Sequence, residues 1–207
     1  MRITKISPCR TDKSRVMIYL DDRSWHKVSA RTVHELGLKA GDEVCEETMP
    51  VINSAARKSR ARETAARILG RRNMSSSELM RKLEEKGIAE QDAQAACEWA
   101  QEMGVVDDSA YAEMLVRHYR AKGFGNRRVA EELKKRGIGR GIIDTLLEEA
   151  PDMGAEIRAF IEKKTAGREI TPALIGRVTA ALERRGHGYG KIRAVFRELE
   201  IDMEDSD

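Results

Sequence analysis

Three stretches of the sequence decide the fold: LMRKLEEKGI (residues 79–88), VAEELKKRGI (129–138) and VTAALERRGH (178–187). Their glycines, Gly87, Gly137 and Gly186, lie 50 and then 49 residues apart, and in each stretch a leucine stands four residues before the glycine. Three matches in the same register indicate an internal repeat with a period of about 50 residues.

Each repeat has the sequence pattern of three helices. Apolar residues recur at helical spacing in three segments per repeat, and polar helix-start residues precede several of them. In the first repeat Ser75 and Glu78 have the spacing of a capping box, and each of the three glycines suits the residue just past a helix end. The sequence therefore predicts a mainly α protein, in which three tandem three-helix repeats stack into an elongated curved array.

The N-terminal segment has a different pattern. Residues 15–20 and 25–28 alternate and are rich in β-prone side chains, with a turn between them, which predicts a small hairpin or a three-stranded sheet. Ser29 is expected to cap a short helix that turns Val33 and Leu36 inward and ends at Gly37, and residues 43–44 suggest a last strand.

These patterns predict four parts of the chain. They are a small β-rich module at residues 1–55 and three-helix repeats at 56–106, 107–152 and 153–207, the last with an acidic tail over 202–207. The basic run at 57–62 is interpreted either as a linker or as the exposed start of a long helix. A module of about 50 residues has little core of its own, so it is expected to dock on the next part or on a partner.

The stretch GVVDDSAYA (residues 104–112) contains the only local candidate for an acidic active site. Asp107 and Asp108 suit a metal-binding or acid–base pair, but aspartate is also a preferred N-cap, and no histidine or third carboxylate stands nearby. We favour the capping interpretation, with Val105 and Val106 packed between repeats. Tyr111 is then expected to begin a buried stripe and to share a helical face with Met114, Leu115 and His118, of which His118 is interpreted as a core or rim histidine. Asn126 is expected to cap the next helix.

No other motif in the sequence indicates catalysis or a cofactor. The glycines around residues 137–141 lack the preceding strand and the lysine of a phosphate loop. Cys9, Cys45 and Cys97 are far apart and odd in number, which favours reduced thiols in a cytoplasmic protein. We expect no catalytic residue, no metal and no cofactor, and no apolar stretch is long enough to span a membrane.

Charge is unevenly distributed although the formal net charge is only +3. Residues 78–113 hold ten acidic and three basic side chains, whereas residues 115–140 hold nine basic and two acidic ones, and residues 57–72 add seven basic against one acidic. Such runs often only solvate helix faces, but they also suit phosphates or an acidic protein surface. The candidate binding residues are Arg67, Arg71, Arg72, Arg117, Arg120, Lys122, Arg127, Arg128, Lys134, Lys135, Arg136 and Arg140.

Residues 103–138, MGVVDDSAYAEMLVRHYRAKGFGNRRVAEELKKRGI, resemble the RecX family of RecA regulators. The shared pattern is the Gly-apolar-apolar-Asp-Asp step, the aromatic-Ala pair, the Lys-Gly-x-Gly turn and the basic helix that ends in Gly-Ile. SSSELMRKLEEKGI and LERRGHGYGKIRAVFREL fit the first and third repeats of the family. Two positions depart from its pattern: Asn126 replaces a frequent proline, and His187 replaces an apolar residue.

The resemblance implies a regulator rather than an enzyme. Similar proteins bind the RecA recombinase filament on DNA and restrain its extension, ATP hydrolysis and strand exchange in DNA repair and the SOS response. We therefore expect a cytoplasmic monomer whose partner is the RecA filament, with DNA touched directly or through RecA. The alternative is a sequence-independent DNA-binding helical module that acts without RecA. Reversing the charges of Arg127 and Arg128 is expected to weaken binding with little loss of folding.

Overall fold

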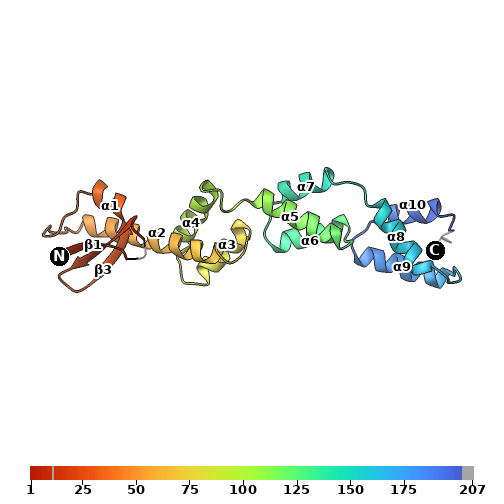
Figure 1. Ribbon diagram of the computed structural model, residues 1–207, viewed down its shortest axis with the longest axis horizontal. Coiled ribbons are helices and arrows are strands. Elements are labelled where there is room, and N and C mark those ends of the chain that lie inside the picture. The colour runs from red at the N-terminus through yellow and green to blue at the C-terminus, as the bar shows by residue number, and fades with distance from the viewer. Residues whose placement is uncertain (11, 202–207) are drawn as a thin grey trace. The chain divides into compact units, whose positions relative to one another are not determined.

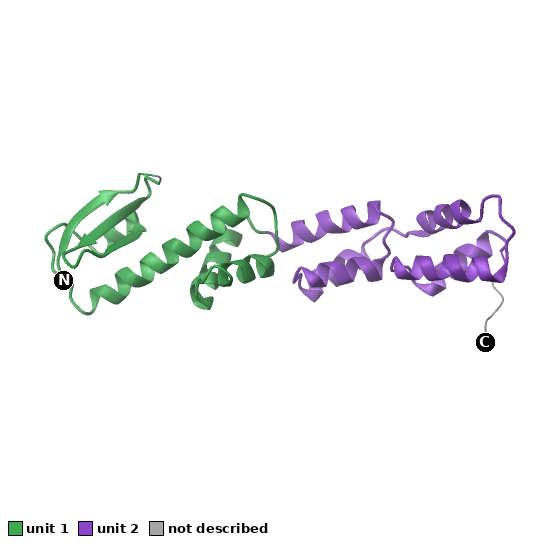
Figure 2. Ribbon diagram, turned by 90° about the horizontal axis from the view of Figure 1, so that it is seen from below, with its two compact units in different colours: residues 1–106 green, residues 107–207 purple. Residues whose placement is uncertain are grey.

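A computed structural model describes residues 1–10 and 12–201, and the predicted acidic tail over 202–207 lies outside the described residues. The chain divides into two compact units, residues 1–106 and 107–207 (Figure 2). The described residues form a three-stranded sheet and ten α-helices (Figure 1), which confirms a mainly helical protein with a small β-rich N-terminal module.

The first unit begins with an antiparallel sheet of β1 (Ile3–Pro8), β2 (Arg15–Leu20) and β3 (Trp25–Ser29), in that order. Alternation along the strands places Ile3, Ile18 and Val28 in a buried core. The strand predicted at residues 43–44 is wrong: Glu43 forms only an isolated bridge with Arg2. Val44 is nevertheless buried in the sheet core, and this explains its apolar side chain.

Helix α1 (Ala30–Glu35) begins where the sequence predicts, because the Ser29 hydroxyl accepts a hydrogen bond from the Thr32 amide at 3.0 Å. Gly37 follows with a positive φ. The prediction that Leu36 faces inward is wrong. Leu36 is the C-terminal cap residue and is exposed, and Leu38, beyond the glycine, packs on the sheet core instead.

Helix α2 (Thr48–Leu69) serves both halves of the first unit. It packs both against β3 and against helix α4 (Glu90–Glu102). Ile52 belongs to the sheet core, whereas Ala61 and Ala65 belong to the three-helix core. The basic run at 57–62 is therefore neither a linker nor a helix start but the middle of α2, which passes through the predicted boundary at residues 55 and 56.

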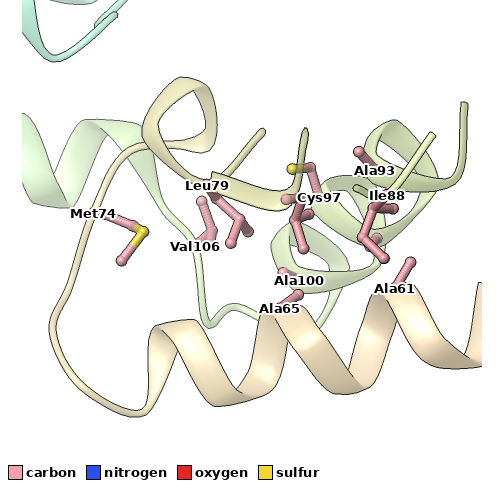
Figure 3. Close-up of a cluster of buried hydrophobic side chains, with 11 residues drawn as sticks. Ala61, Ala65, Met74, Leu79, Ile88, Ala93, Cys97, Ala100 and Val106 are labelled. Atoms are coloured by element: carbon pink, nitrogen blue, oxygen red, sulfur yellow. The ribbon is translucent and has the colours of Figure 1, made fainter. Parts of the chain in front are cut away.

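The first three-helix group consists of the C-terminal half of α2 together with α3 (Ser76–Glu84) and α4. Figure 3 shows Ala61 and Ala65 of α2 facing the apolar side chains of α3, α4 and the segment that follows. The predicted capping box is present: the Ser75 hydroxyl accepts from the Glu78 amide at 3.0 Å, and the Glu78 carboxylate accepts from the Ser75 amide at 3.3 Å.

The second unit contains two further three-helix groups. The middle group is α5 (Asp108–Ala121), α6 (Asn126–Lys135) and α7 (Arg140–Glu148), and the last group is α8 (Gly154–Thr165), α9 (Pro172–Arg184) and α10 (Tyr189–Glu198). Each group encloses its own apolar core. Thr171 caps α9 with Pro172 at its first position, as predicted. Asn126 does not cap α6, because Gly125 occupies that position.

The three repeat glycines end their helices in the same way. Gly87, Gly137 and Gly186 have φ values of +73°, +73° and +90°. The amide that follows each glycine donates to the carbonyl of the repeat leucine, with distances of 3.1 Å to Leu83, 3.2 Å to Leu133 and 3.1 Å to Leu182. This is the Schellman arrangement, and a positive φ favours glycine there. The repeat read from the sequence therefore reflects one recurring helix end.

The middle and last groups meet at a contact that we call the glycine joint, formed by Gly125 and Gly186. The Gly125 amide donates to the Arg185 carbonyl at 2.9 Å, and the Arg127 amide donates to the Gly186 carbonyl at 3.2 Å. A Cβ atom on Gly125 would overlap the Gly186 carbonyl, and one on Gly186 would overlap the Arg128 backbone. Backbone therefore contacts backbone directly at this joint.

Candidate partner-binding surface

The Asp107–Asp108 pair begins α5. The Asp107 carboxylate accepts a hydrogen bond from the Ala110 amide at 2.9 Å, and Asp108 is the first helical residue. This confirms the capping interpretation. Within residues 1–10 and 12–201, no group of three or more His, Cys, Asp or Glu side chains could hold a metal ion.

The residues that flank this pair differ partly from the prediction. Val106 is buried in the core of the first unit, whereas Val105 is 57% exposed, since only one of two successive side chains can turn into that core. Tyr111 and Leu115 are buried as predicted, but Met114 and His118 are exposed. The buried stripe of α5 continues through Ala112 and Val116, which lie one residue beyond Tyr111 and Leu115.

Basic side chains of the first unit surround one hollow between α2 and α3, which we call the α2–α3 hollow. Its volume is about 410 Å³, and its one carboxylate is that of Glu85. The cations that line it are Arg67, Arg71, Arg72, Lys82 and Lys86. Five cations around one acidic group produce a positive field that attracts anions.

Most cations of this hollow have no intramolecular anionic partner. Arg72 forms an ion pair with Glu78 at 3.2 Å, and Arg67 interacts electrostatically with Glu63, but Arg71, Lys82 and Lys86 form no ion pair with any residue that the structure describes. Glu85 lies 3.8 Å from Arg81, outside the hollow, so part of its charge is already compensated. The α2–α3 hollow therefore combines an open surface with uncompensated positive charge.

In the basic block over residues 115–140, three arginines hold the second unit together. Arg120 donates to the Pro151 carbonyl at 2.9 Å and to the Asn126 side chain at 2.7 Å. Arg127 donates to the Glu183 carbonyl at the end of α9 at 2.6 Å, and Arg136 donates to the Tyr111 hydroxyl at 2.9 Å. Burial lowers the pKa of Arg120, a direction that accords with a structural role.

Four further cations of this block pair along their own helices. Arg117 lies 3.5 Å from Glu113, Arg140 lies 3.3 Å from Asp144, and both Arg128 and Lys135 approach Glu132, at 2.9 and 3.1 Å. Lys122 and Lys134 form no ion pair within the described part of the chain. The block therefore offers a partner much less free charge than its composition indicates.

Sequence reasoning missed several cations. Lys82 and Lys86 line the α2–α3 hollow although they lie in a stretch that is acidic overall. In the last helical group Lys164, Arg168 and Arg177 surround a small hollow of about 180 Å³ beside Phe160. Helical spacing places Phe160 and Lys164 on one face of α8, but it identifies neither Lys86 nor Arg168, because α3 ends at Glu84 and α8 ends at Thr165.

Comparison with known proteins places this architecture in one family. Residues 61–99 match the family model for the first three-helix domain of RecX, and residues 107–147 match the model for its second three-helix domain. The regulatory protein RecX of Trichlorobacter lovleyi is 36% identical over 139 residues, which cover 64% of this chain and 90% of that protein. The regulatory protein RecX of Halorhodospira halophila is 34% identical over 145 residues, covering 69% of this chain and 90% of that protein.

Solved structures show the same fold. A crystal structure of a regulatory protein RecX aligns with a TM-score of 0.77 over 96% of this chain and 98% of that one, at 22% identity. RecX from Lactobacillus salivarius aligns with a TM-score of 0.63 over 70% of this chain and 97% of its own, at 20% identity. None of the helices in the described part of the chain is long and apolar enough to cross a membrane. On the strength of the matched domains and relatives, this chain belongs to the RecX family of regulatory proteins.

Proposed function

We propose that this chain regulates the RecA recombinase by binding the RecA–DNA filament, and that it inhibits ATP hydrolysis, filament extension and strand exchange. Family membership supports a regulatory role, and the α2–α3 hollow supports the kind of partner. Its uncompensated cations suit an acidic protein surface or DNA phosphates, and the DNA of such a filament supplies phosphates.

The residues that we propose for the binding surface differ in part from those predicted from the sequence. Arg67, Arg71, Arg72, Lys82 and Lys86 form its centre, since they lie together around one hollow. Lys122 and Lys134 are further contacts, because no described residue pairs with them. Arg120, Arg127 and Arg136 have internal hydrogen bonds and are assigned to the structure of the second unit.

We also propose that the protein acts in the cytoplasm as a monomer. The support comes from the sequence, in which Cys9, Cys45 and Cys97 are odd in number, lie far apart and form no CxxC pair. Such cysteine usage is typical of a reducing compartment, where disulfides are rare.

The alternative is a DNA-binding module that needs no recombinase. The same cations support it, because contacts to phosphates supply most non-specific DNA affinity. The two proposals differ in what a recombinase adds: binding to DNA alone, with a steep dependence on salt and no effect on ATP hydrolysis by RecA, favours the alternative.

The test compares two neighbouring residues of α3. Lys82 lines the α2–α3 hollow, whereas the exposed Arg81 does not. Lys82→Glu and Arg81→Glu change the net charge equally, but only Lys82→Glu removes a cation from the lining, whereas Arg81→Glu breaks the 3.8 Å ion pair with Glu85. We expect Lys82→Glu to require about tenfold more protein for half-maximal inhibition of DNA-dependent ATP hydrolysis by RecA, an effect of about 1.4 kcal/mol. Arg81→Glu is expected to resemble the wild type.

The wild-type titration tests the function and the variants test the surface. Unchanged ATP hydrolysis with wild-type protein at stoichiometric ratios contradicts regulation of RecA. Equal weakening by both variants contradicts a specific role for the hollow and indicates a diffuse effect of charge. Circular dichroism of both variants checks that α3 remains folded.

A further inference from the structure

A second recess in the first unit, which we call the α2–sheet pocket, lies between the N-terminal module and the three-helix group. Its volume is about 640 Å³, within the range of roughly 300–1,000 Å³ typical of small-ligand sites. One face of α2 forms its floor at helical spacing, with Val51, Ser54, Ala55, Lys58, Ser59 and Arg62. The rest of the lining comes from Ser14 in the turn before β2, Arg15 of β2, Ser29 of β3, Thr32 of α1 and Trp99 of α4, together with Pro50.

The charged groups of this pocket are all cations. Arg15, Lys58 and Arg62 line it, and no carboxylate does. Arg15 is neutralised by Asp12 at 3.0 Å and Glu63 at 3.2 Å. Lys58 and Arg62 form no ion pair with any residue of 1–10 or 12–201, and both are exposed. Two cations are therefore available to an anionic ligand.

The remaining lining suits a planar ligand that also carries hydrogen-bonding groups. The Arg62 guanidinium lies over the Trp99 ring, 5.7 Å from its centroid, so a flat cation and a flat ring are close together. Five lining side chains carry hydroxyls, of which the Ser14 hydroxyl donates to Asp12 at 2.6 Å and those of Ser29 and Thr32 bond to each other at 2.8 Å, so Ser54 and Ser59 are the hydroxyls offered to a ligand. Aromatic and guanidinium planes stack on nucleobases, while cations and hydroxyls bind phosphate and sugar oxygens.

We infer that the α2–sheet pocket binds a nucleotide of a single-stranded nucleic acid, with its phosphate on Lys58 and Arg62 and its base stacked at Arg62 and Trp99. An unpaired strand fits better than a duplex, because a duplex keeps its bases stacked on each other and unavailable to a recessed ring. An acidic peptide uses the two cations but leaves the indole without a planar partner. The inference does not depend on regulation of RecA and is tested without it.

The chain contains two tryptophans, Trp25 and Trp99, so Trp25→Phe leaves Trp99 as the single indole. We propose to titrate this variant with a thymidine oligonucleotide of about ten nucleotides, a length in the range that single-strand sites cover. Saturable quenching of Trp99 fluorescence is expected. Adding Lys58→Ala and Arg62→Ala is expected to weaken binding about tenfold and to reduce the slope of log affinity against log salt by about 0.7 for each phosphate that the variant no longer neutralises.

The matched control removes two cations from the other side of the same helix. Arg57 and Arg60 line a different hollow, beside Trp25, so Arg57→Ala with Arg60→Ala loses the same charge without changing a residue of the pocket, although it also breaks the Arg57–Asp92 ion pair at 3.2 Å. This pair is expected to change affinity less than threefold. Lys58→Ala alone serves as a milder variant if the double variant alters the circular dichroism, because Lys58 has no partner within the described chain.

Four results overturn the inference: no quenching of Trp99 by the oligonucleotide, equal quenching by a duplex of the same length, equal quenching by polyglutamate or inorganic phosphate, or equal weakening by the two double variants. The Lys82→Glu test of recombinase regulation leaves the pocket intact. A failure of either proposal is therefore visible without a failure of the other.

Discussion

In the first unit one long helix, α2, joins the sheet to a three-helix group, whereas in the second unit two three-helix groups meet backbone to backbone at Gly125 and Gly186. The α2 connection depends on side chains spread over several turns, from Ile52 in the sheet core to Ala65 in the helical core. The glycine joint depends on the absence of side chains at two positions. The first connection should therefore tolerate single substitutions that the second does not.

The glycine joint is particular to the middle group. Gly125 is the N-cap of α6, and the corresponding N-caps of α3 and α9 are Ser75 and Thr171. Serine and threonine cap well through their side chains, but their Cβ atoms prevent an approach as close as that at Gly125. At this position the middle group lacks a capping side chain and instead contacts its neighbour directly.

The largest expected effect is that of Gly186→Ala. Gly186 has a positive φ, which costs a residue with a side chain about 1–2 kcal/mol, and its new Cβ atom would overlap the Arg128 backbone, an overpacking cost of about 1–3 kcal/mol. We expect the free energy of unfolding, measured in urea, to fall by about 2–5 kcal/mol. Gly87→Ala is the matched control, because Gly87 also has a positive φ, of +73°, but no atom lies within 4 Å of a Cβ added there. An equal loss in both variants would show that close contact adds nothing at the joint.

Arg127→Glu is expected to cost about 1–2 kcal/mol. The Arg127 side chain donates to the Glu183 carbonyl near the C-terminal end of α9, where a cation is favourable and an anion is not. Reversing both Arg127 and Arg128 removes the same contact, so we expect the double variant to lose stability, in contrast to the sequence-based expectation that folding is spared. Lys134→Glu, on the same helix and without an ion pair to any described residue, is the control for net charge. Equal thermal stability of the two variants would argue against a structural role for Arg127.

Glu63→Gln tests the α2 connection and is expected to cost about 1 kcal/mol or less, because ion pairs that solvent reaches contribute little. The Glu63 carboxylate forms ion pairs with Lys27 at 2.9 Å and with Arg15 at 3.2 Å, and these pairs connect α2 to the sheet. The hydrogen bond from Lys27 and the nearby cations lower the pKa of Glu63. Its contribution is therefore present above the ordinary pKa of glutamate and is lost as the pH falls through the lowered pKa. A loss of several kcal/mol in urea unfolding would contradict a connection spread over many side chains.

The sequence predicted features that depend on neighbouring residues along the chain. The Ser75 capping box, the N-cap at Asp107 and the repeat glycines are local, so spacing alone identified them. Spacing could not show that Arg127 has a structural role whereas Lys82 is open to a partner, because Arg127 donates to the Glu183 carbonyl, 56 positions away in the sequence. Likewise nothing near Trp99 in the sequence indicates that Ser14, Lys58 and Arg62 surround it, since β2, α2 and α4 come together only in the folded unit.

His187 gives the smallest and most specific test of the glycine joint. It is buried, and its Nε2 atom lies 3.1 Å from the Gly123 carbonyl, so the neutral ring donates this hydrogen bond. Burial lowers the pKa of His187, and the positive charges of Arg185 and Lys191 lower it further. The hydrogen bond to the Gly123 carbonyl and the charge of Glu156 raise this pKa, but by less. The unfolded chain therefore binds a proton more readily than the folded one.

The sign of the pH dependence follows from that difference. The contribution of the neutral His187 ring to the free energy of unfolding is fully present above the ordinary histidine pKa of about 6.5. It is lost as the pH falls below that value. We expect the free energy of unfolding to fall less between pH of about 7.5 and 5.5 in His187→Leu than in the wild type. His118→Leu is the control, since His118 lies exposed on α5 in the same unit. If His187→Leu keeps the full pH dependence of the wild type, the folded and unfolded chains bind a proton at His187 equally well, and burial does not lower its pKa. A steeper fall in the variant than in the wild type would show that the folded joint holds the imidazolium.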